Sequence, residues 1–413
     1  MSQVRRERNC PVCESTSKDL IIKIDFELFE RHPMNGGYDV VQCNACGFVF
    51  ADTRVTQNEL DWYYTELSKY EDKTISTGGG FTQKDKDRLI ETAVFLSKHI
   101  PDKNARIVDL GCANGGMLKE LKNLGYNNLV GIDPSSACIK ITEEEVGCEC
   151  YQHSLFDIPG TVGKFDVVIL SHVLEHVLNV RETISITDNL LNENGSLYLE
   201  CPNAEYYYDV IHAPLQEFNA EHINHFTETA FENLMGLFHY SKTVTGDKTM
   251  VIASNQDYHA VYGLFKKQTD NTSLFTVRFD NTIRKHIDQY INDSNKIFDK
   301  IKETIAALPK DEPIALVGIG QFAFKLLKTD IFQHGRAYKL FDNNSMNVAR
   351  KINGKEIMHG DNLVSEYRTE KFTIIISSLI YEVPIAKKIS ELFERNGEKV
   401  PEMIGFSHLL SGV

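Results

Sequence analysis

The sequence predicts an α/β protein built on a doubly wound parallel sheet, with a small zinc-ribbon-like lobe before the sheet and a Rossmann-like α/β domain after it. Three observations carry this prediction. Two Cys-x-x-Cys pairs lie in the first 50 residues. Strand-like and helix-like segments alternate from about residue 105, the pattern of a doubly wound sheet. A second alternating block begins near residue 313.

Length and charge limit the functional classes. The chain has 413 residues, of which 42% are hydrophobic and 25% charged, as expected for two or three globular domains. A net charge of −14 offers no broad basic face, so we expect no nucleic-acid partner. No apolar run approaches the ~18 residues of a membrane span, and the N-terminus lacks a secretory pattern. We therefore expect no membrane partner and a cytoplasmic location; the oligomeric state is left open.

The cysteine pairs predict a structural zinc site. Zinc prefers four tetrahedral thiolate or imidazole ligands, and a Cys-x-x-Cys turn directs two sulfurs at one ion. Four thiolate ligands leave no open coordination position on the ion. Its expected role is therefore structural: it would stabilise a small lobe that has little hydrophobic core of its own. The competing interpretation is a set of reduced, buried thiols. The predicted ligands are Cys10, Cys13, Cys43 and Cys46, whereas packing is expected for Cys112, Cys138, Cys148, Cys150 and Cys201.

Three domains are predicted, over residues 1–55, 56–278 and 279–413. The middle domain begins with a helical segment that carries the aromatic residues Trp62, Tyr63, Tyr64 and Tyr70 and is interrupted by glycines at 78–80. An amphipathic helix over 281–308 leads to the third domain. There Gly318, Gly320 and Asp342 form either a tight turn with a packing residue or a ligand site, and the sequence does not separate the two.

The segment 109–116, DLGCANGG, follows a strand and opens a helix. Glycines in such a loop let the backbone approach a nucleotide. Asp133, at the end of the next strand, is placed to accept hydrogen bonds from ribose hydroxyls. A dinucleotide and S-adenosylmethionine both fit. The absence of Gly-x-Gly-x-x-Gly spacing, and a carboxylate at Asp109 that can face an ammonium group, favour S-adenosylmethionine.

The motifs at 109–115, 131–135, 165–176 and 200–203 resemble the class I S-adenosylmethionine-dependent methyltransferases in type and order. The resemblance covers the central block. It departs at Ala113, where the family commonly has glycine. For Glu175 and His176 it predicts packing or capping more than catalysis. It implies cofactor contacts from Asp109, Gly111, Gly115, Asp133, Phe156, Asp157 and Ser171.

The whole chain, with CPVC, CNACG, the segment 221–227 and the late 317–320 and 341–343, resembles the sugar C-methyltransferases that act on nucleotide-linked keto-deoxy sugars. This resemblance implies a nucleotide-linked sugar as substrate. It also implies a third domain that helps to enclose the sugar without binding a second methyl donor.

A carbon beside a ketone needs a positioned base before it can accept a methyl group, and histidine suits that task. We expect His222 to be the base, Glu221 to orient it, and His225 to be the competitor. Tyr64, Tyr70 and Asn219 are the expected sugar contacts, although Asn219 and His225 replace aromatic residues common in the family. Alternatively, this segment only leads into the next helix, capped by Thr229 and Glu232.

Two other functions remain open from the sequence. An O- or N-methyltransferase acting on a sugar or small metabolite would need the same architecture, but only a base for a hydroxyl or amine that is already nucleophilic. A non-catalytic partner that binds nucleotide sugars with a decayed donor site is the second alternative. The intact Asp133 and loop glycines argue against the latter.

Overall fold

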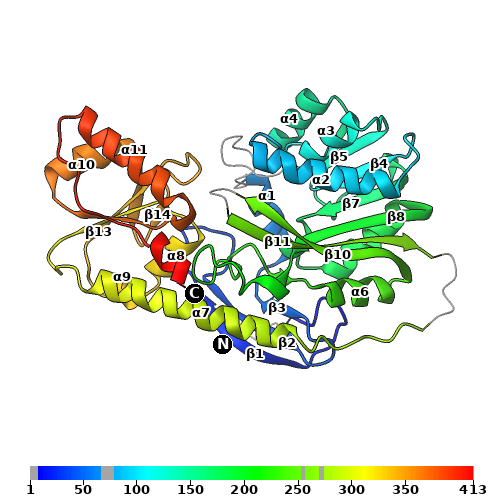
Figure 1. Cartoon of the computed structure of the whole chain (residues 1–413), viewed down its shortest axis with the longest axis horizontal. Helices are drawn as coiled ribbons and strands as arrows, with labels where there is room; N and C mark the ends of the chain where they lie inside the picture. The colour runs from blue at the N-terminus through cyan, green and yellow to red at the C-terminus, as the bar shows by residue number, and fades with distance from the viewer. Residues whose placement is uncertain (1–7, 67–78, 253–255, 269–273, 413) are drawn as a thin grey trace. The chain divides into compact units, whose positions relative to one another are not determined.

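The computed structural model describes residues 8–66, 79–252, 256–268 and 274–412 (Figure 1). It divides into two compact units, each assembled from separate stretches of chain. The first unit comprises 1–21, 40–206 and 221–284, and the second comprises 22–39, 207–220 and 285–413. These two units are interleaved along the chain. The continuous domains predicted over 1–55, 56–278 and 279–413 stay predictions.

The first unit contains the predicted doubly wound sheet, and this part of the fold prediction is confirmed. Five parallel strands follow the order β8-β7-β4-β5-β6, and the antiparallel strands β11 and β10 extend the sheet beyond β8. These strands are β4 (Ile107–Leu110), β5 (Leu129–Asp133), β6 (Glu149–Gln152), β7 (Phe165–Ser171), β8 (Leu191–Pro202), β10 (Tyr240–Ile252) and β11 (Gln256–Lys267).

Helices pack on this sheet, with α2 against α3 and α6 against β10 and β11 (Figure 1). The helices of the first unit are α1 (Gln57–Glu66), α2 (Gln83–His99), α3 (Gly116–Asn123), α4 (Ser136–Val146), α5 (Val180–Leu190) and α6 (Glu228–Leu237). Since β4 lies between β5 and β7, the strand order reverses at β4. Ligands of doubly wound sheets bind at the carboxyl ends of the strands beside such a switch point.

A four-stranded sheet in the order β1-β2-β3-β9 adjoins the two cysteine pairs: Cys10 and Cys13 precede β1, and Cys43 ends β2. Its strands are β1 (Lys18–Asp25), β2 (Gly37–Cys43), β3 (Val49–Asp52) and β9 (Asn224–His225). Strand β3 pairs antiparallel with β9, which places Val49 opposite His225. Cys10, Phe48 and Phe50 share one buried core with Phe226 and Phe231. The segment that carries the cysteine pairs is therefore part of the first unit's core.

The second unit contains a six-stranded sheet in the order β14-β15-β13-β12-β16-β17, parallel except for the β14–β15 pair. The strands are β12 (Ile314–Val317), β13 (Tyr338–Asp342), β14 (Lys351–Ile352), β15 (Lys355–His359), β16 (Thr373–Ile376) and β17 (Met403–Ile404). The helices are α8 (Gln321–Leu327), α9 (Asp330–Gln333), α10 (Leu363–Thr369) and α11 (Glu382–Arg395). The helix predicted over 281–308 is confirmed as α7 (Ile283–Ala306).

The turn after β12 favours one of the two interpretations left open by the sequence. Gly318 has a φ of 90°, and the Asp342 carboxylate accepts hydrogen bonds from the backbone N–H of Ile319 and Asn344 and from the Asn347 side chain, each at 2.9 Å. Asp342 is therefore engaged in holding its own loop, which favours the tight-turn interpretation. Among the described helices, none is long and apolar enough to cross a membrane.

Candidate active site

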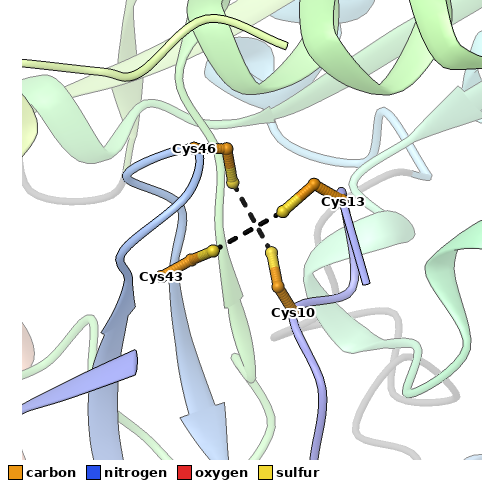
Figure 2. A group of neighbouring side chains, drawn as sticks. All are labelled: Cys10, Cys13, Cys43 and Cys46. Carbon is orange, nitrogen blue, oxygen red and sulfur yellow. Dashed lines mark hydrogen bonds between the residues drawn. The ribbon is translucent and has the colours of Figure 1, made fainter. Parts of the chain in front are cut away.

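The four cysteines of the two pairs converge on one point. Figure 2 shows their sulfur atoms directed toward one another. The Sγ atoms of Cys10 and Cys46 are 3.6 Å apart and those of Cys13 and Cys43 are 3.5 Å apart, and all four lie within 4.8 Å of one another. Zinc–sulfur bonds of about 2.3 Å place tetrahedral thiolates about 3.8 Å apart. The cluster therefore fits a four-thiolate metal site.

The second cysteine turn depends on Gly47. This residue has a φ of 80°, and a Cβ atom there would lie 2.7 Å from the carbonyl oxygen of Asp280. The Gly47 N–H donates to Cys43 O at 2.9 Å, which closes the turn between the two sulfurs. A side chain at this position would open the turn that carries Cys43 and Cys46.

The five remaining cysteines pack, as predicted. Cys112, Cys138 and Cys201 are buried free thiols, whereas Cys148 and Cys150 are half-buried with their Sγ atoms 3.7 Å apart.

The predicted cofactor loop has the backbone that its glycines require. Gly111 and Gly115 have φ values of 78° and 75°. A Cβ atom at Gly111 would lie 2.8 Å from Val173 Cγ2, and one at Gly115 would lie 2.6 Å from Thr142 Cγ2. Both glycines are thus needed for the loop's shape and packing.

Ala113 also lies in the left-handed region, with a φ of 45°. This conformation costs a residue with a Cβ atom about 1–2 kcal/mol, whereas glycine adopts it freely but loses about 0.5–1 kcal/mol through added chain entropy. Ala113→Gly is therefore expected to stabilise the protein by roughly 0.5 kcal/mol. Chemical denaturation measures this change. Ala349 has a φ of 68°, so Ala349→Gly is also expected to raise the free energy of unfolding. A lower free energy of unfolding in both variants would contradict this explanation.

The acidic residues of the predicted cofactor site lie at strand ends. Asp133 ends β5, and its carboxylate accepts hydrogen bonds from the N–H of Ala113 and of Ser135, both at 2.9 Å, which ties the two loops together. Asp109 lies in β4 and is buried. Burial, with a contribution from nearby Asp133, raises the pKa of Asp109 to about 7. A buried carboxyl group with this pKa is poised to ionise when a cation binds beside it.

The other predicted cofactor residues differ in burial. Ser171 ends β7 opposite Glu200 of β8 and is half-buried. Phe156, in the loop after β6, packs partly against the core. Asp157 beside it is exposed, and its N–H donates to Ser154 O at 3.1 Å.

Glu221 and His222 lie in a group of polar side chains from α1, from the short helix η3 (Leu174–His176) and from the segment before β9. Tyr63 donates its hydroxyl to Glu221 Oε1 at 3.0 Å. His176 Nδ1 lies 3.1 Å from Glu221 O, and the rings of His176 and His222 are 4.9 Å apart. Tyr64 contacts His176 edge to face. Glu221 is buried, whereas His222 is partly exposed.

The two candidate bases have different environments. His225 is fully buried in β9, and burial, with a contribution from His222, lowers the pKa of His225 to about 3. A histidine with that pKa is a poor base near neutral pH. The partly exposed His222 can instead meet a substrate, so the geometry favours it over His225.

Two of the predicted substrate contacts lie in different units, and the third lies outside the described residues. Tyr64 lies beside the His176 ring. Asn219 is buried in the second unit, where its carbonyl oxygen accepts a hydrogen bond from Tyr38 at 2.8 Å. Tyr70 lies outside the described residues. The expected helix cap was wrong in position: Thr227 caps α6 by accepting from Ala230 N, not Thr229 with Glu232.

The sequence did not predict a group of ion pairs that lies close to His176 and includes His172, Glu175 and Glu200. His172 lies between the carboxylates of Glu175 and Glu200, with nitrogen–oxygen distances of 3.2 Å to each. Lys248 Nζ contacts Glu200 at 2.8 Å. The strand-end position of His172 and Glu200 was the available signal for these two residues. No local pattern in the sequence singles out Lys248.

Comparison with known proteins identifies the central domain. Residues 81–241 match the family described as "Methyltransferase domain". The mitochondrial ubiquinone biosynthesis O-methyltransferase of Rattus norvegicus is 30% identical over 127 residues, covering 29% of this chain and 36% of the relative. Polyketide synthase PksM of Bacillus subtilis (strain 168) is 31% identical over 117 residues, covering 25% of this chain and 3% of that protein. The match thus spans about a third of the first relative's length.

Solved methyltransferase structures resemble part of the chain. The plantazolicin methyltransferase BpumL in complex with SAH aligns with a TM-score of 0.40 and 16% identity, over 51% of this chain and 94% of that one. The magnesium protoporphyrin IX methyltransferase of Synechocystis PCC 6803 aligns with a TM-score of 0.35 and 15% identity, over 45% and 84%.

Proposed function

We propose, from the premise that residues 81–241 form a methyltransferase domain, that this chain transfers the methyl group of S-adenosylmethionine to a carbon of a nucleotide-linked keto-deoxy sugar. The observation that carries the proposal is the His222 site. A partly exposed histidine follows a buried glutamate that accepts a hydrogen bond from Tyr63, and its ring lies 4.9 Å from that of His176 in the short helix after β7.

The proposed roles of the residues follow from their chemistry. When bound, S-adenosylmethionine supplies an electrophilic methyl group on a sulfonium. Gly111 and Gly115 shape the loop beside it, Asp109 pairs with its ammonium group, and Asp133 lies near its ribose. His222 removes a proton from the carbon beside the sugar ketone, and Glu221, fixed by Tyr63, orients that histidine. The remaining task is to align the carbon with the methyl group.

We further propose that the four-thiolate cluster holds a structural zinc ion. The support is the set of sulfur separations, which match a tetrahedral thiolate site, and the glycine-dependent turn at Gly47. The site has four protein ligands and would keep no open coordination position. Its role would therefore be to fix the fold around β2 and β3.

Mass spectrometry of nucleotide-linked 4-keto sugars incubated with the enzyme and S-adenosylmethionine tests the proposed function. A product with a new carbon–carbon bond is expected. In deuterated water, the carbon beside the ketone should also exchange its proton for deuterium in a His222-dependent manner. A methyl ether or methylamine product would overturn the proposal.

O-methylation is the second candidate, and one observation favours it: several relatives matched over this domain are named as O-methyltransferases. That chemistry needs no carbon acid. An enzyme that forms a methyl ether, without exchange beside a carbonyl, would establish it.

Binding of the methyl donor is expected to depend on pH through Asp109. The carboxyl has a pKa of about 7 in the free protein and must ionise to pair with an ammonium group. Donor affinity should therefore fall as the pH decreases, by roughly eightfold between pH 7.5 and 6.0, because binding displaces a proton. Calorimetric titration measures this dependence. In Asp109→Asn, donor affinity should no longer change with pH over this range. The same change of affinity with pH as in wild type would contradict the role of Asp109.

A further inference from the structure

Four ionisable side chains near the candidate base form a continuous chain that is largely buried. His172 Nδ1 is 3.2 Å from Glu175 Oε1, and His172 Nε2 is 3.2 Å from Glu200 Oε1. Lys248 Nζ is 2.8 Å from Glu200 Oε2. The side chains of Glu175, Glu200 and Lys248 are 2%, 0% and 9% exposed, and that of His172 is 22% exposed. We call Glu175, His172, Glu200 and Lys248 the buried ionic chain.

Acidic and basic groups alternate along the buried ionic chain. Burial alone would lower the pKa of His172, but its two carboxylate neighbours raise it. Burial alone would raise the pKa of Glu175, but the hydrogen bond from His172 and the nearby histidines lower it to about 2. A buried charge is tolerated when it is paired in this way. Glu175 is consequently an anion throughout the neutral range.

One side of Glu175 faces the histidines of the candidate site. A carboxylate oxygen of Glu175 and a ring nitrogen from each of His176 and His222 all lie within 4.8 Å of one another. Glu175 Oε1 lies 3.2 Å from His172 Nδ1 and 3.9 Å from His176 Nε2. Cys201 of β8 also faces this carboxylate. The negative charge is thus directed at the His176–His222 pair.

We propose that Glu175 is a positioning residue that stabilises the positive charge formed on the His176–His222 pair, and that His172, Glu200 and Lys248 keep it in place. This inference rests on the proposed function and names further residues for it. The substrate C–H bond breaks, its electron pair enters the enolate, and the proton goes to a ring nitrogen of His222. Glu175 takes no proton, and the new imidazolium lies near a fixed anion.

Glu175→Gln tests the proposal, because it removes the charge and keeps the shape. Deuterium exchange beside the sugar ketone and methyl transfer should both fall roughly 100-fold, the scale of a lost preorganised charge. The dissociation constant for S-adenosylhomocysteine should stay within twofold. Glu175→Asp should recover at least tenfold of the loss. The matched control is Glu182→Gln, the same change at an exposed position of α5, which should leave both rates unchanged.

His172→Gln provides a second readout and decides the question if Glu175→Gln does not fold. His172 is one of the groups that lower the pKa of buried Glu175, so its replacement should let that pKa rise, because burial then counts for more. The groups facing Glu175 are then His176, His222 and Cys201. The exchange rate should approach that of wild type at pH 8 and fall at least tenfold below it near pH 5.5. A merely structural role would lower the rate equally at both pH values.

The outcomes separate this inference from the proposed function. If wild-type protein exchanges the proton and Glu175→Gln retains its rate within threefold, the role of Glu175 is overturned while the proposed function stands. If activity is lost to a chelator and restored by Mn²⁺ or Mg²⁺, the group binds a cation and the inference is also overturned. If wild type exchanges no proton with any keto sugar, both fail.

Discussion

Replacing His222 by asparagine is expected to lower methyl transfer to the sugar carbon about 1,000-fold, within the range seen when a general base is removed. Asparagine keeps a polar side chain of similar size but cannot accept the proton. Because the cofactor loop does not involve His222, the dissociation constant for S-adenosylhomocysteine should change less than threefold. Single-turnover kinetics and calorimetry on the same preparation measure the two quantities.

Two further histidine variants make this result interpretable. His334→Asn changes an exposed histidine of the second unit and should leave the rate unchanged. His225→Asn replaces a fully buried ring and should lower the melting temperature while the folded protein keeps its rate within about fivefold. Loss of methyl transfer in the folded His225→Asn protein, with activity retained in His222→Asn, would reverse the assignment of the base.

The second large effect is expected at the cysteine cluster. Wild-type protein should contain about one zinc ion per chain, and Cys10→Ser should contain almost none. Because binding of a structural zinc contributes directly to folding, the melting temperature should fall by more than roughly 5 °C, which corresponds to about 4 kcal/mol in a chain of 413 residues. Metal analysis and thermal denaturation measure the two changes.

The control for Cys10→Ser is Cys148→Ser, which alters a half-buried thiol outside the cluster and should keep the zinc. Loss of zinc should also reduce methyl transfer, because β3 of the cysteine-rich sheet pairs with β9, which begins two residues after His222. Metal-free wild-type protein with unchanged melting temperature would refute a structural role for the ion.

Local patterns allowed the sequence to predict much of the fold and part of the site. The spacing of the cysteine pairs predicts that their sulfur atoms converge, because each Cys-x-x-Cys turn directs two sulfurs to one side. The alternation after residue 105 and the helix over 281–308 also depend on short-range periodicity. The glycines at 111 and 115 were expected beside a ligand, and the structure adds that steric contacts with Val173 and Thr142 require them.

Features that depend on residues far apart in sequence were out of reach. The ion pair between Glu200 and Lys248 joins different strands, and no local spacing relates the two residues. The capping of α6 was misplaced by two residues, because Thr227 and Thr229 are equally plausible caps in sequence. Only the backbone geometry, with Thr227 extended and accepting from Ala230 N, distinguishes them.

The interleaving of the two compact units has a consequence for how this chain can be cut. A fragment ending at residue 278 would carry 22–39 and 207–220 without the 285–413 stretch with which they form a unit. Phe26 and Phe218, 2% and 0% exposed in the intact chain, pack with Lys325 and Tyr290. In the fragment these apolar rings would face water. Truncation at the boundary suggested by the sequence should therefore yield a partly unfolded product that is prone to aggregate, because it exposes side chains that the intact chain buries.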